Sequence, residues 1–413
     1  MRSLAGTMAA LAGLAAPASA QLPLPAPKAP PPPVAEPAPS QPPASSPGKL
    51  SVPKLLARGL PVPIRGRGAT PGARVTVQVR LRRRWSAVAS RRARRSGRYR
   101  LRFRPRRVRR AYRLRATTPG GPPSRPVRVR TRAIVLAAVG DINLGDGVAA
   151  VMAYRGVRFP WSGTARMLRR ADIAYGNLEC AVSRRGSPVP KQYNFRGHPR
   201  ALRAAARYAG MDVFSLANNH VGDFGTAALL DTLAWARRFG TVPVGAGRNR
   251  TAAARPRVVR RLGLKVAFVG VSDVVPPGFA AGPRSPGTTY ADPALIRSSV
   301  RRARRRAHVV VAAFHWGVER SPTPSGRQRF LAGVARRAGA QVILGAHPHV
   351  LQPVATGKRS VTAFSLGNFV WSAGSPASAS TGILRLRLSA RGVEGARLAP
   401  AVIESTRPRL LRR

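Results

Sequence analysis

Residues 133–145 read Ala-Ile-Val-Leu-Ala-Ala-Val-Gly-Asp-Ile-Asn-Leu-Gly, and they decide the fold class of most of this 413-residue chain. Ile134–Val139 is a short, continuous apolar run, which is typical of a strand buried on both faces. The run ends in Gly140 and Asp141, and Asn143 follows two residues later. Polar residues at the carboxyl end of a buried strand are typical of α/β folds, whose ligands gather at that edge.

Further apolar runs alternate with helix-like segments after this stretch and predict an α/β domain over residues 133–413. The predicted strands are Ile173–Tyr175, Val213–Leu216, Val266–Val271, Val309–Phe314 and Val342–Leu344. Four late segments rich in β-forming residues are expected to complete a second sheet: Leu351–Ala355, Val361–Leu366, Gly382–Leu388 and Arg397–Val402.

Polar residues follow nearly every one of these strands. They include four of the six histidines and stand at Asn177 and Glu179, at Asn218, Asn219 and His220, at His315, and at His347 and His349. A single such residue is often only a turn or a helix cap. Five groups in register instead predict one polar site. Its nitrogen and oxygen donors, without thiolates, suit Mn²⁺, Fe, Zn²⁺ or Mg²⁺.

The series GDINLG, GNLE, NNH, HWGVE, GAHPH and SLGNF resembles the CapA family, also called the poly-γ-glutamate capsule synthesis family. The resemblance covers roughly residues 133–405. The family's domain is similar to the calcineurin-like metallophosphoesterases, so it implies an α/β/β/α sandwich and metal-dependent hydrolysis of that type. It also implies a role in the synthesis of a capsule or another anionic surface polymer.

Residue by residue, the resemblance implies one or two divalent metal ions. Asp141 and His349 would hold the first, Asn219, His315 and His347 the second, and Glu179 would bridge them. His220 would be the acid that protonates the leaving oxygen. Two metals about 3.5–4 Å apart are suited to an in-line displacement.

Two positions depart from the phosphoesterase pattern. Asn143 stands where those enzymes have histidine, and Glu179, preceded by Asn177, stands where they have aspartate. Asn143 and Asn177 are therefore further candidate ligands. Amides bind metals more weakly than imidazoles do, so the first metal position is expected to be the weaker one. Asp146, Asp223 and Glu319 lie beside the motifs and are candidates to orient the ligands.

The N-terminus predicts export. Residues 1–20 combine Arg2, an apolar stretch and an Ala-x-Ala ending, which is typical of a secretory signal peptide, with an uncleaved anchor as the alternative. Residues 21–48 are proline-dominated and predict a stiff linker. We therefore expect a secreted or cell-surface protein. The single cysteine, Cys180, excludes a disulfide framework and reads as a small buried hydrophobe.

Residues 49–132 alternate apolar and arginine positions with regular turn signals, and they predict a small immunoglobulin-like β-sandwich. This β module holds 28 Lys and Arg residues and no acid, in a chain of net charge +60. One interpretation is a general bias toward arginine codons, since the chain has only six lysines. The other is capture of a polyanion at the cell surface. Nucleic acid fits the charge equally well, but the expected export argues against it.

Three functions remain open at this stage. The first is an exported metal-dependent hydrolase that acts on an anionic surface polymer such as poly-γ-glutamate, capsule or wall polymer. The second is a non-catalytic component that binds or exports the polymer, together with the membrane surface or with membrane proteins of capsule synthesis. The third is a wall-binding protein that acts through the basic β module.

Overall fold

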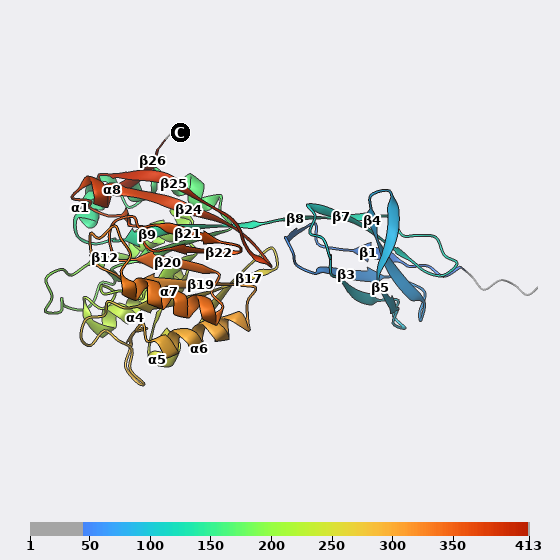
Figure 1. Ribbon diagram of the computed structural model, residues 1–413, viewed down its shortest axis with the longest axis horizontal. Coiled ribbons are helices and arrows are strands. Elements are labelled where there is room, and N and C mark those ends of the chain that lie inside the picture. Colours follow the sequence, from blue (N-terminus) through green and yellow to red (C-terminus); the bar gives the residue numbers. More distant parts are fainter. Residues whose placement is uncertain (1–43, 412–413) are drawn as a thin grey trace, which may run out of the picture. The chain divides into compact units, whose positions relative to one another are not determined.

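The computed structural model describes residues 44–411 (Figure 1). The predicted signal peptide and most of the predicted linker lie outside the described residues. Within residues 44–411, no helix is both long and apolar enough to cross a membrane.

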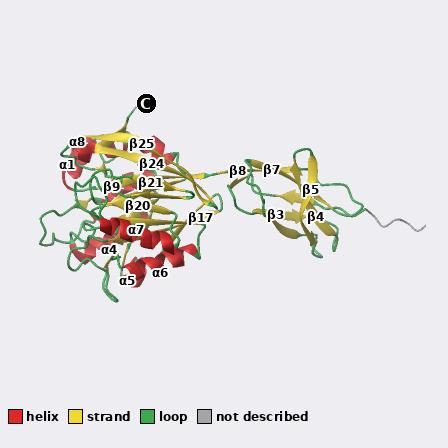
Figure 2. Cartoon of the chain, in the orientation of Figure 1, coloured by secondary structure: helices red, strands yellow, loops and turns green. Residues whose placement is uncertain are grey.

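Residues 49–132 contain only strands among their regular elements (Figure 2). The strands are β1 (Lys49–Ser51), β2 (Leu55–Ala57), β3 (Val62–Arg67), β4 (Arg74–Leu81), β5 (Arg84–Arg92), β6 (Tyr99–Phe103), β7 (Ala111–Thr117) and β8 (Val127–Arg132). They form two sheets in the orders β1-β3-β6 and β2-β8-β7-β4-β5, with β2 parallel to β8. Two largely antiparallel sheets with this connectivity form an immunoglobulin-like sandwich, as predicted.

Alternation along the β module's strands separates the core from the arginines. Val75, Val77 and Val79 of β4 are buried, as are Tyr112 and Leu114 of β7. The Tyr112 hydroxyl donates a hydrogen bond to the Arg107 carbonyl (3.1 Å) and accepts one from the Arg109 N–H (2.9 Å). This tyrosine corner fixes the loop that enters β7, an arrangement common in immunoglobulin-like domains.

Residues 134–410 build two larger sheets (Figure 1). The first sheet has the order β14-β13-β10-β9-β24-β25-β26, and β23 also pairs with β9. Its strands are β9 (Ile134–Ile142), β10 (Ile173–Leu178), β13 (Val213–Ser215), β14 (Val242–Val244), β23 (Asn368–Val370), β24 (Ser380–Ser389), β25 (Gly392–Glu404) and β26 (Arg407–Leu410).

The second sheet has the order β16-β17-β19-β20-β22-β21. Its strands are β16 (Arg257–Arg261), β17 (Leu264–Ser272), β19 (Val309–His315), β20 (Val342–Ala346), β21 (Val354–Gly357) and β22 (Ser360–Ala363). Two short pairs lie outside both sheets: β11 (Ala181–Val182) with β12 (Arg196–Gly197), and β15 (Ala246–Gly247) with β18 (Gly287–Thr288).

The expectation that the four late segments complete a second sheet holds for only two of them: Leu351–Ala355 and Val361–Leu366 overlap β21 and β22 of the second sheet, whereas Gly382–Leu388 and Arg397–Val402 lie in β24 and β25 of the first. β24 pairs antiparallel with β9 and carries β25 and β26 into the first sheet. β22 pairs parallel with β20 and completes the second sheet with β21. The late segments therefore divide between the sheets, because each extends an edge left open by the earlier parallel strands.

The helices cover the outer faces of the two sheets. They are α1 (Asp146–Arg155), α2 (Ala165–Arg169), α3 (Pro199–Ala204), α4 (Gly225–Arg238), α5 (Arg250–Ala253), α6 (Pro293–Arg304), α7 (Gly326–Ala338) and α8 (Pro376–Ala379), with short turns η1 (Phe159–Trp161) and η2 (Ala205–Ala209). Figure 1 shows α6 and α7 alongside the strands of the second sheet.

Three apolar clusters fill the spaces between these layers. Alternate residues of β9 point to opposite sides, with Leu136 in the cluster between the sheets and Val139 in the cluster beneath α1–α4. Tyr175 and Phe268 stack across the sheets with ring centroids 6.0 Å apart. A third cluster joins the second sheet to α6 and α7. The domain is therefore an α/β/β/α sandwich, as predicted.

Candidate metal centre

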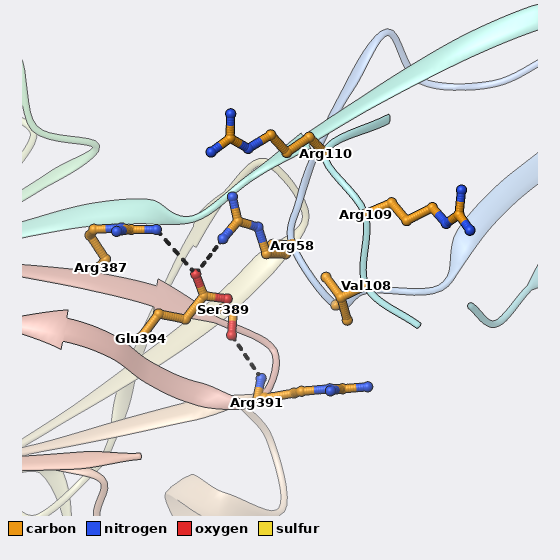
Figure 3. A pocket seen from close by; sticks show the side chains of 9 residues that line it. Arg58, Val108, Arg109, Arg110, Arg387, Ser389, Arg391 and Glu394 are labelled. Atoms are coloured by element: carbon orange, nitrogen blue, oxygen red, sulfur yellow. Dashed lines mark hydrogen bonds and ion pairs between the residues drawn. The ribbon is translucent and has the colours of Figure 1, made fainter. Parts of the chain in front are cut away.

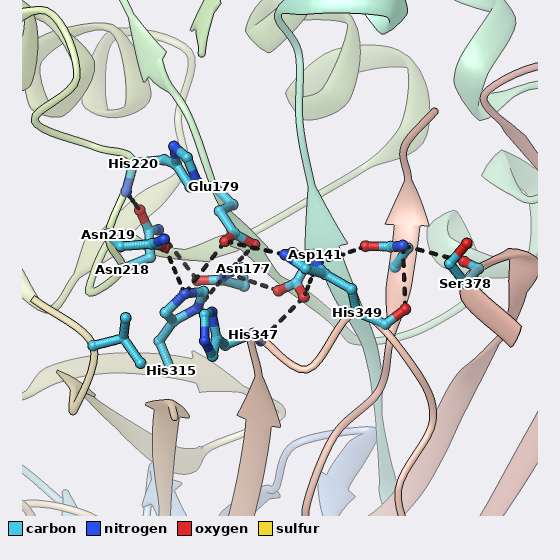
Figure 4. A network of polar contacts seen from close by, with 12 residues as sticks. Asp141, Asn177, Glu179, Asn218, Asn219, His220, His315, His347, His349 and Ser378 are labelled. Carbon is cyan, nitrogen blue, oxygen red and sulfur yellow. Dashed lines mark hydrogen bonds and ion pairs between the residues drawn. The ribbon is translucent and has the colours of Figure 1, made fainter. Parts of the chain in front are cut away.

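The residues at the carboxyl ends of five segments meet at one place between the two sheets (Figure 4). In the first sheet, Asp141 lies at the end of β9, Glu179 follows β10 and Asn219 lies after β13. In the second sheet, His315 ends β19 and His347 follows β20. The side chains of Asp141 and Glu179 are fully buried. Buried carboxylates are costly unless a cation or several hydrogen bonds compensate them.

Asp141 is held by its neighbours on three sides. Its Oδ1 accepts a hydrogen bond from the Asn177 amide (2.8 Å), and its Oδ2 accepts one from the His347 backbone N–H (3.1 Å). Nδ1 of His349 lies 3.3 Å from the same Oδ2. The parallel pairing of β9 with β10 brings Asn177 directly opposite Asp141.

Glu179 lies between the imidazole of His315, at the end of β19, and that of His349, in the loop after β20. Its Oε1 is 3.3 Å from Nε2 of His315 and 3.9 Å from Nε2 of His349. This buried oxygen accepts no hydrogen bond from any described residue. Burial, and next the negative charge of Asp141, raise the pKa of Glu179 well above its usual value.

The three imidazoles around the carboxylates differ in their surroundings. Burial and the neighbouring imidazoles lower the pKa of His315 well below its usual value, and burial lowers the pKa of His347 to about 4. Burial also acts against a charged His349, but the hydrogen bond and charge of Asp141 outweigh it and raise the pKa of His349. Neutral imidazoles are the form that binds metals.

Two groups of side chains present their donor atoms within 4.8 Å of one another: Glu179 with His347 and His349, and Asp141 with Glu179 and His315. Glu179 belongs to both groups, but the groups divide the other ligands differently from the expectation, which placed Asp141 with His349 and His315 with His347. Buried Nδ1 of His347, like Oε1 of Glu179, has no hydrogen-bond partner among the described residues. A divalent cation fits these donors, because it would satisfy both atoms and favour the ionised form of Glu179.

The remaining candidate ligands take different places. Oδ1 of Asn219 lies 2.8 Å from Nε2 of His315, inside the cluster. The amide nitrogen of Asn177 contacts Oδ1 of Asp141 (2.8 Å) and Nδ1 of His315 (3.2 Å). Oδ1 of Asn143 instead accepts the Gly145 N–H (2.7 Å). The structure therefore groups six of the eight candidates around the cluster's centre. Asn177 supports Asp141 and His315 through its amide nitrogen, and the Asn143 side chain bonds within its own loop.

His220 stands beside this cluster and is fixed through its Nδ1. That atom lies 2.6 Å from Oδ2 of Asp223, a fully buried carboxylate that also accepts the Phe195 backbone N–H (2.8 Å). The Phe195 ring packs on the imidazole with centroids 4.2 Å apart. Among residues 44–411, Nε2 of His220 forms no hydrogen bond, so it is the nitrogen left to exchange a proton.

The sequence analysis missed two residues that shape the site, Lys191 and Asn368, and gave no separate role to a third, Asn218. Nζ of Lys191 contacts the Asn219 carbonyl (2.6 Å), Nδ1 of His220 (3.1 Å) and Oδ1 of Asp223 (2.6 Å). Asn218 accepts the His220 N–H through its Oδ1 (3.0 Å), and Oδ1 of Asn368 lies 2.9 Å from Nδ1 of His349. Lysine is rare in this chain, with six residues among 73 Lys and Arg, so the choice of lysine at position 191 was a usable signal.

The backbone at the histidine loop adopts an uncommon conformation. His347 has φ of 95° and His349 has φ of 58°, both in the left-handed region that favours glycine. Residues other than glycine keep such angles only where the surroundings enforce them, and they cluster at functional sites. Here, β20 on one side and the Leu351–Leu366 bridge on the other fix the ends of the loop.

Comparison with known proteins gives the family. Residues 135–373 match the family model described as "Bacterial capsule synthesis protein PGA_cap". The PGA biosynthesis protein CapA of Bacillus subtilis (strain 168) is 30% identical over 279 residues, which cover 65% of this chain and 72% of that protein. The capsule biosynthesis protein CapA of Bacillus anthracis is 28% identical over 293 residues, which cover 69% and 71%.

Among solved structures, the chain is similar to the 5'-nucleotidase precursor of Thermus thermophilus, at 17% identity and a TM-score of 0.41. The match covers 68% of this chain and 54% of that one. The family match spans more than half of the sequence and contains every strand end that supplies a candidate ligand. This chain belongs to the PGA_cap family of bacterial capsule synthesis proteins.

Proposed function

We propose that this protein is an exported, metal-dependent hydrolase of phosphoesterase type that acts in the synthesis of an anionic capsule polymer. The observation that carries the proposal is the buried centre itself. Asp141, Glu179, Asn219, His315, His347 and His349 supply carboxylates, an amide and imidazoles from both sheets, and two of their buried donor atoms lack partners among the described residues. Structural cores rarely leave such atoms unpaired.

Within this proposal, a bound divalent cation supplies Lewis-acid polarisation of an ester oxygen. The chain's own residues do the remaining work. Asp223 holds the His220 ring through Nδ1 and leaves Nε2 free, so that a protonated His220 would give its Nε2 proton to the leaving oxygen as a water molecule attacks phosphorus and the ester bond breaks. Asn177 braces Asp141 and His315, so the donors from the two sheets keep their spacing.

The test separates binding from turnover. Metal content and the hydrolysis of a generic phosphodiester and phosphomonoester are measured for the wild type, Asp141→Asn and His220→Ala. We expect Asp141→Asn to lose metal and activity, and His220→Ala to keep metal but lose at least about 100-fold in turnover. His198→Ala is the matched control, because His198 caps α3 away from the cluster. A wild type free of metal and activity would refute the proposal.

A non-catalytic role in binding or exporting the polymer is the second candidate. It is favoured by the net charge of +60, which suits a polyanionic partner. Its signature is a wild type that binds metal and polymer yet hydrolyses neither ester.

Export is part of the proposal and is tested separately. Its support is the signal-peptide pattern of residues 1–20. The N-terminus of the mature protein, sequenced after expression in a bacterial host, should begin at Gln21. Recovery of the full-length chain from the cytoplasm would contradict export.

A further inference from the structure

Figure 3 shows a second polar pocket of the structure. Its volume is about 380 Å³, and no residue of the metal centre lines it. The lining residues are Arg58, Gly59, Val108, Arg109, Arg110, Arg387, Ser389, Arg391 and Glu394. Five arginines from three separate stretches of the chain therefore surround one carboxylate.

The charges in this pocket do not balance. Arg58 and Arg387 both point at Glu394, with nitrogen–oxygen distances of 2.7 Å and 3.7 Å (Figure 3). Arg109, Arg110 and Arg391 form no ion pair with any residue between 44 and 411, and all three are exposed. The lining carries a formal charge of +4, which attracts anions.

Backbone hydrogen bonds fix the positions from which these arginines emerge. The Ala390 N–H donates to the Arg58 carbonyl (3.0 Å), and the Thr131 N–H donates to the Arg110 carbonyl (2.8 Å). The Ser389 hydroxyl accepts the Arg391 N–H (3.2 Å), and the tyrosine corner holds the Arg109 N–H. The backbone from which these arginine side chains extend is therefore fixed by hydrogen bonds.

We propose that this pocket binds carboxylates of the capsule polymer, as a docking site that retains the chain of γ-linked glutamates while the metal centre acts elsewhere. The proposal deepens the proposed function and rests on it for the identity of the polymer. Glu394 shows the kind of pairing that we propose for the polymer's carboxylates, since its carboxylate contacts two guanidinium groups. Guanidinium forks match carboxylates closely, and further carboxylates would pair with Arg109, Arg110 and Arg391.

A general arginine bias explains single arginines along exposed strand faces but not their convergence on a cavity. The control variant uses that difference. Arg94→Gln/Arg95→Gln/Arg98→Gln removes three exposed charges from the turn between β5 and β6, outside the pocket. The pocket variant Arg109→Gln/Arg110→Gln/Arg391→Gln removes the same charge from the pocket.

Binding of a fluorescent γ-linked glutamate decamer to the full chain is measured by anisotropy at about 0.15 M salt, where charges beyond about 8 Å are largely screened. We expect the pocket variant to weaken binding at least about tenfold and the control variant less than about threefold, with equal thermal unfolding of both. Equal weakening in both variants, or none in the pocket variant, would overturn the pocket assignment. Tighter binding of polyphosphate of equal charge would overturn the assignment to carboxylates.

Two further measurements keep this test apart from the proposed function. Asp141→Asn should bind the decamer as the wild type does, and the pocket variant should hydrolyse a small phosphodiester at the wild-type rate. A failed phosphodiesterase assay with intact decamer binding would therefore refute only the hydrolase proposal. Loss of decamer binding in Asp141→Asn would refute the separateness of the two sites.

Discussion

Replacing Asp223 by asparagine should destabilise the protein around His220, because both carboxylate oxygens of Asp223 have partners there. Oδ2 accepts from Phe195 and faces His220, whereas Oδ1 pairs with Lys191 at 2.6 Å. An amide has only one oxygen. In either orientation its NH₂ group meets a donor, either the ammonium of Lys191 or the Phe195 N–H.

The expected cost follows from burial. Removing one partner of a buried ion pair costs about 3–5 kcal/mol. Asp223 is fully buried but the Lys191 side chain keeps 20% of its exposure, so the lower end, about 3 kcal/mol, applies to Asp223→Asn. The free energy of unfolding is measured by urea titration at neutral pH. Asp146→Asn is the matched control, because Asp146 is exposed at the start of α1 and should cost less than about 1 kcal/mol.

A double-mutant cycle tests the cause. In Lys191→Met/Asp223→Asn the amide no longer meets an ammonium, so the double variant should be more stable than the sum of the single effects by at least about 1 kcal/mol. Additivity within about 0.5 kcal/mol would refute the reasoning, as would an Asp223→Asn variant with wild-type stability.

Three other changes have defined outcomes. Tyr112→Phe removes both hydrogen bonds of the tyrosine corner and should lower the free energy of unfolding by about 1–3 kcal/mol in urea titration, whereas an unchanged value would contradict the assigned role. Gly140→Ala would place its Cβ far closer to the Gly367 carbonyl oxygen than van der Waals contact allows, so we expect little soluble protein on expression, and normal yield would contradict the packing of β9. Burial acts to raise the pKa of Asp172, but hydrogen bonds from Arg132 and the backbone outweigh it and lower that pKa below 3.8. The stability that Asp172 contributes is therefore present above pH 3.8 and is lost as the pH falls through the lower folded-state pKa. The stability difference between wild type and Asp172→Asn should close over that range, and a pH-independent difference would contradict this linkage.

The sequence was most informative where a residue's chemistry and its place on a strand coincide. An apolar run ending in Asp141 or His315 predicts both a buried strand and a polar side chain at its carboxyl end, and the structure brings these ends together. The division of the late strands between two sheets was not predictable in this way. Both edges accept antiparallel or parallel strands of similar composition, and only long-range pairing decides between them.

The contributions of Asn143 and Lys191 depend on loop geometry, which periodicity does not encode. Asn143 has a ligand's chemistry but lies close enough to the Gly145 N–H to cap its own turn. Lys191 lies 28 residues before Asn219 and reaches its carbonyl only because the intervening chain folds back through β12, α3 and β13. Residue type alone therefore makes Asn143 a candidate ligand although its side chain caps a turn, and it gives no role to Lys191.

The left-handed backbone of His347 and His349 means that the native sequence is not the most stable sequence for its own fold. Each such residue costs on the order of 1–3 kcal/mol that glycine would avoid. Selection of a random library for thermal resistance alone should enrich glycine at both positions and discard the imidazoles. Attempts to stabilise this protein would therefore need to keep both histidines fixed, because glycine at these positions would remove two imidazoles from the candidate metal centre.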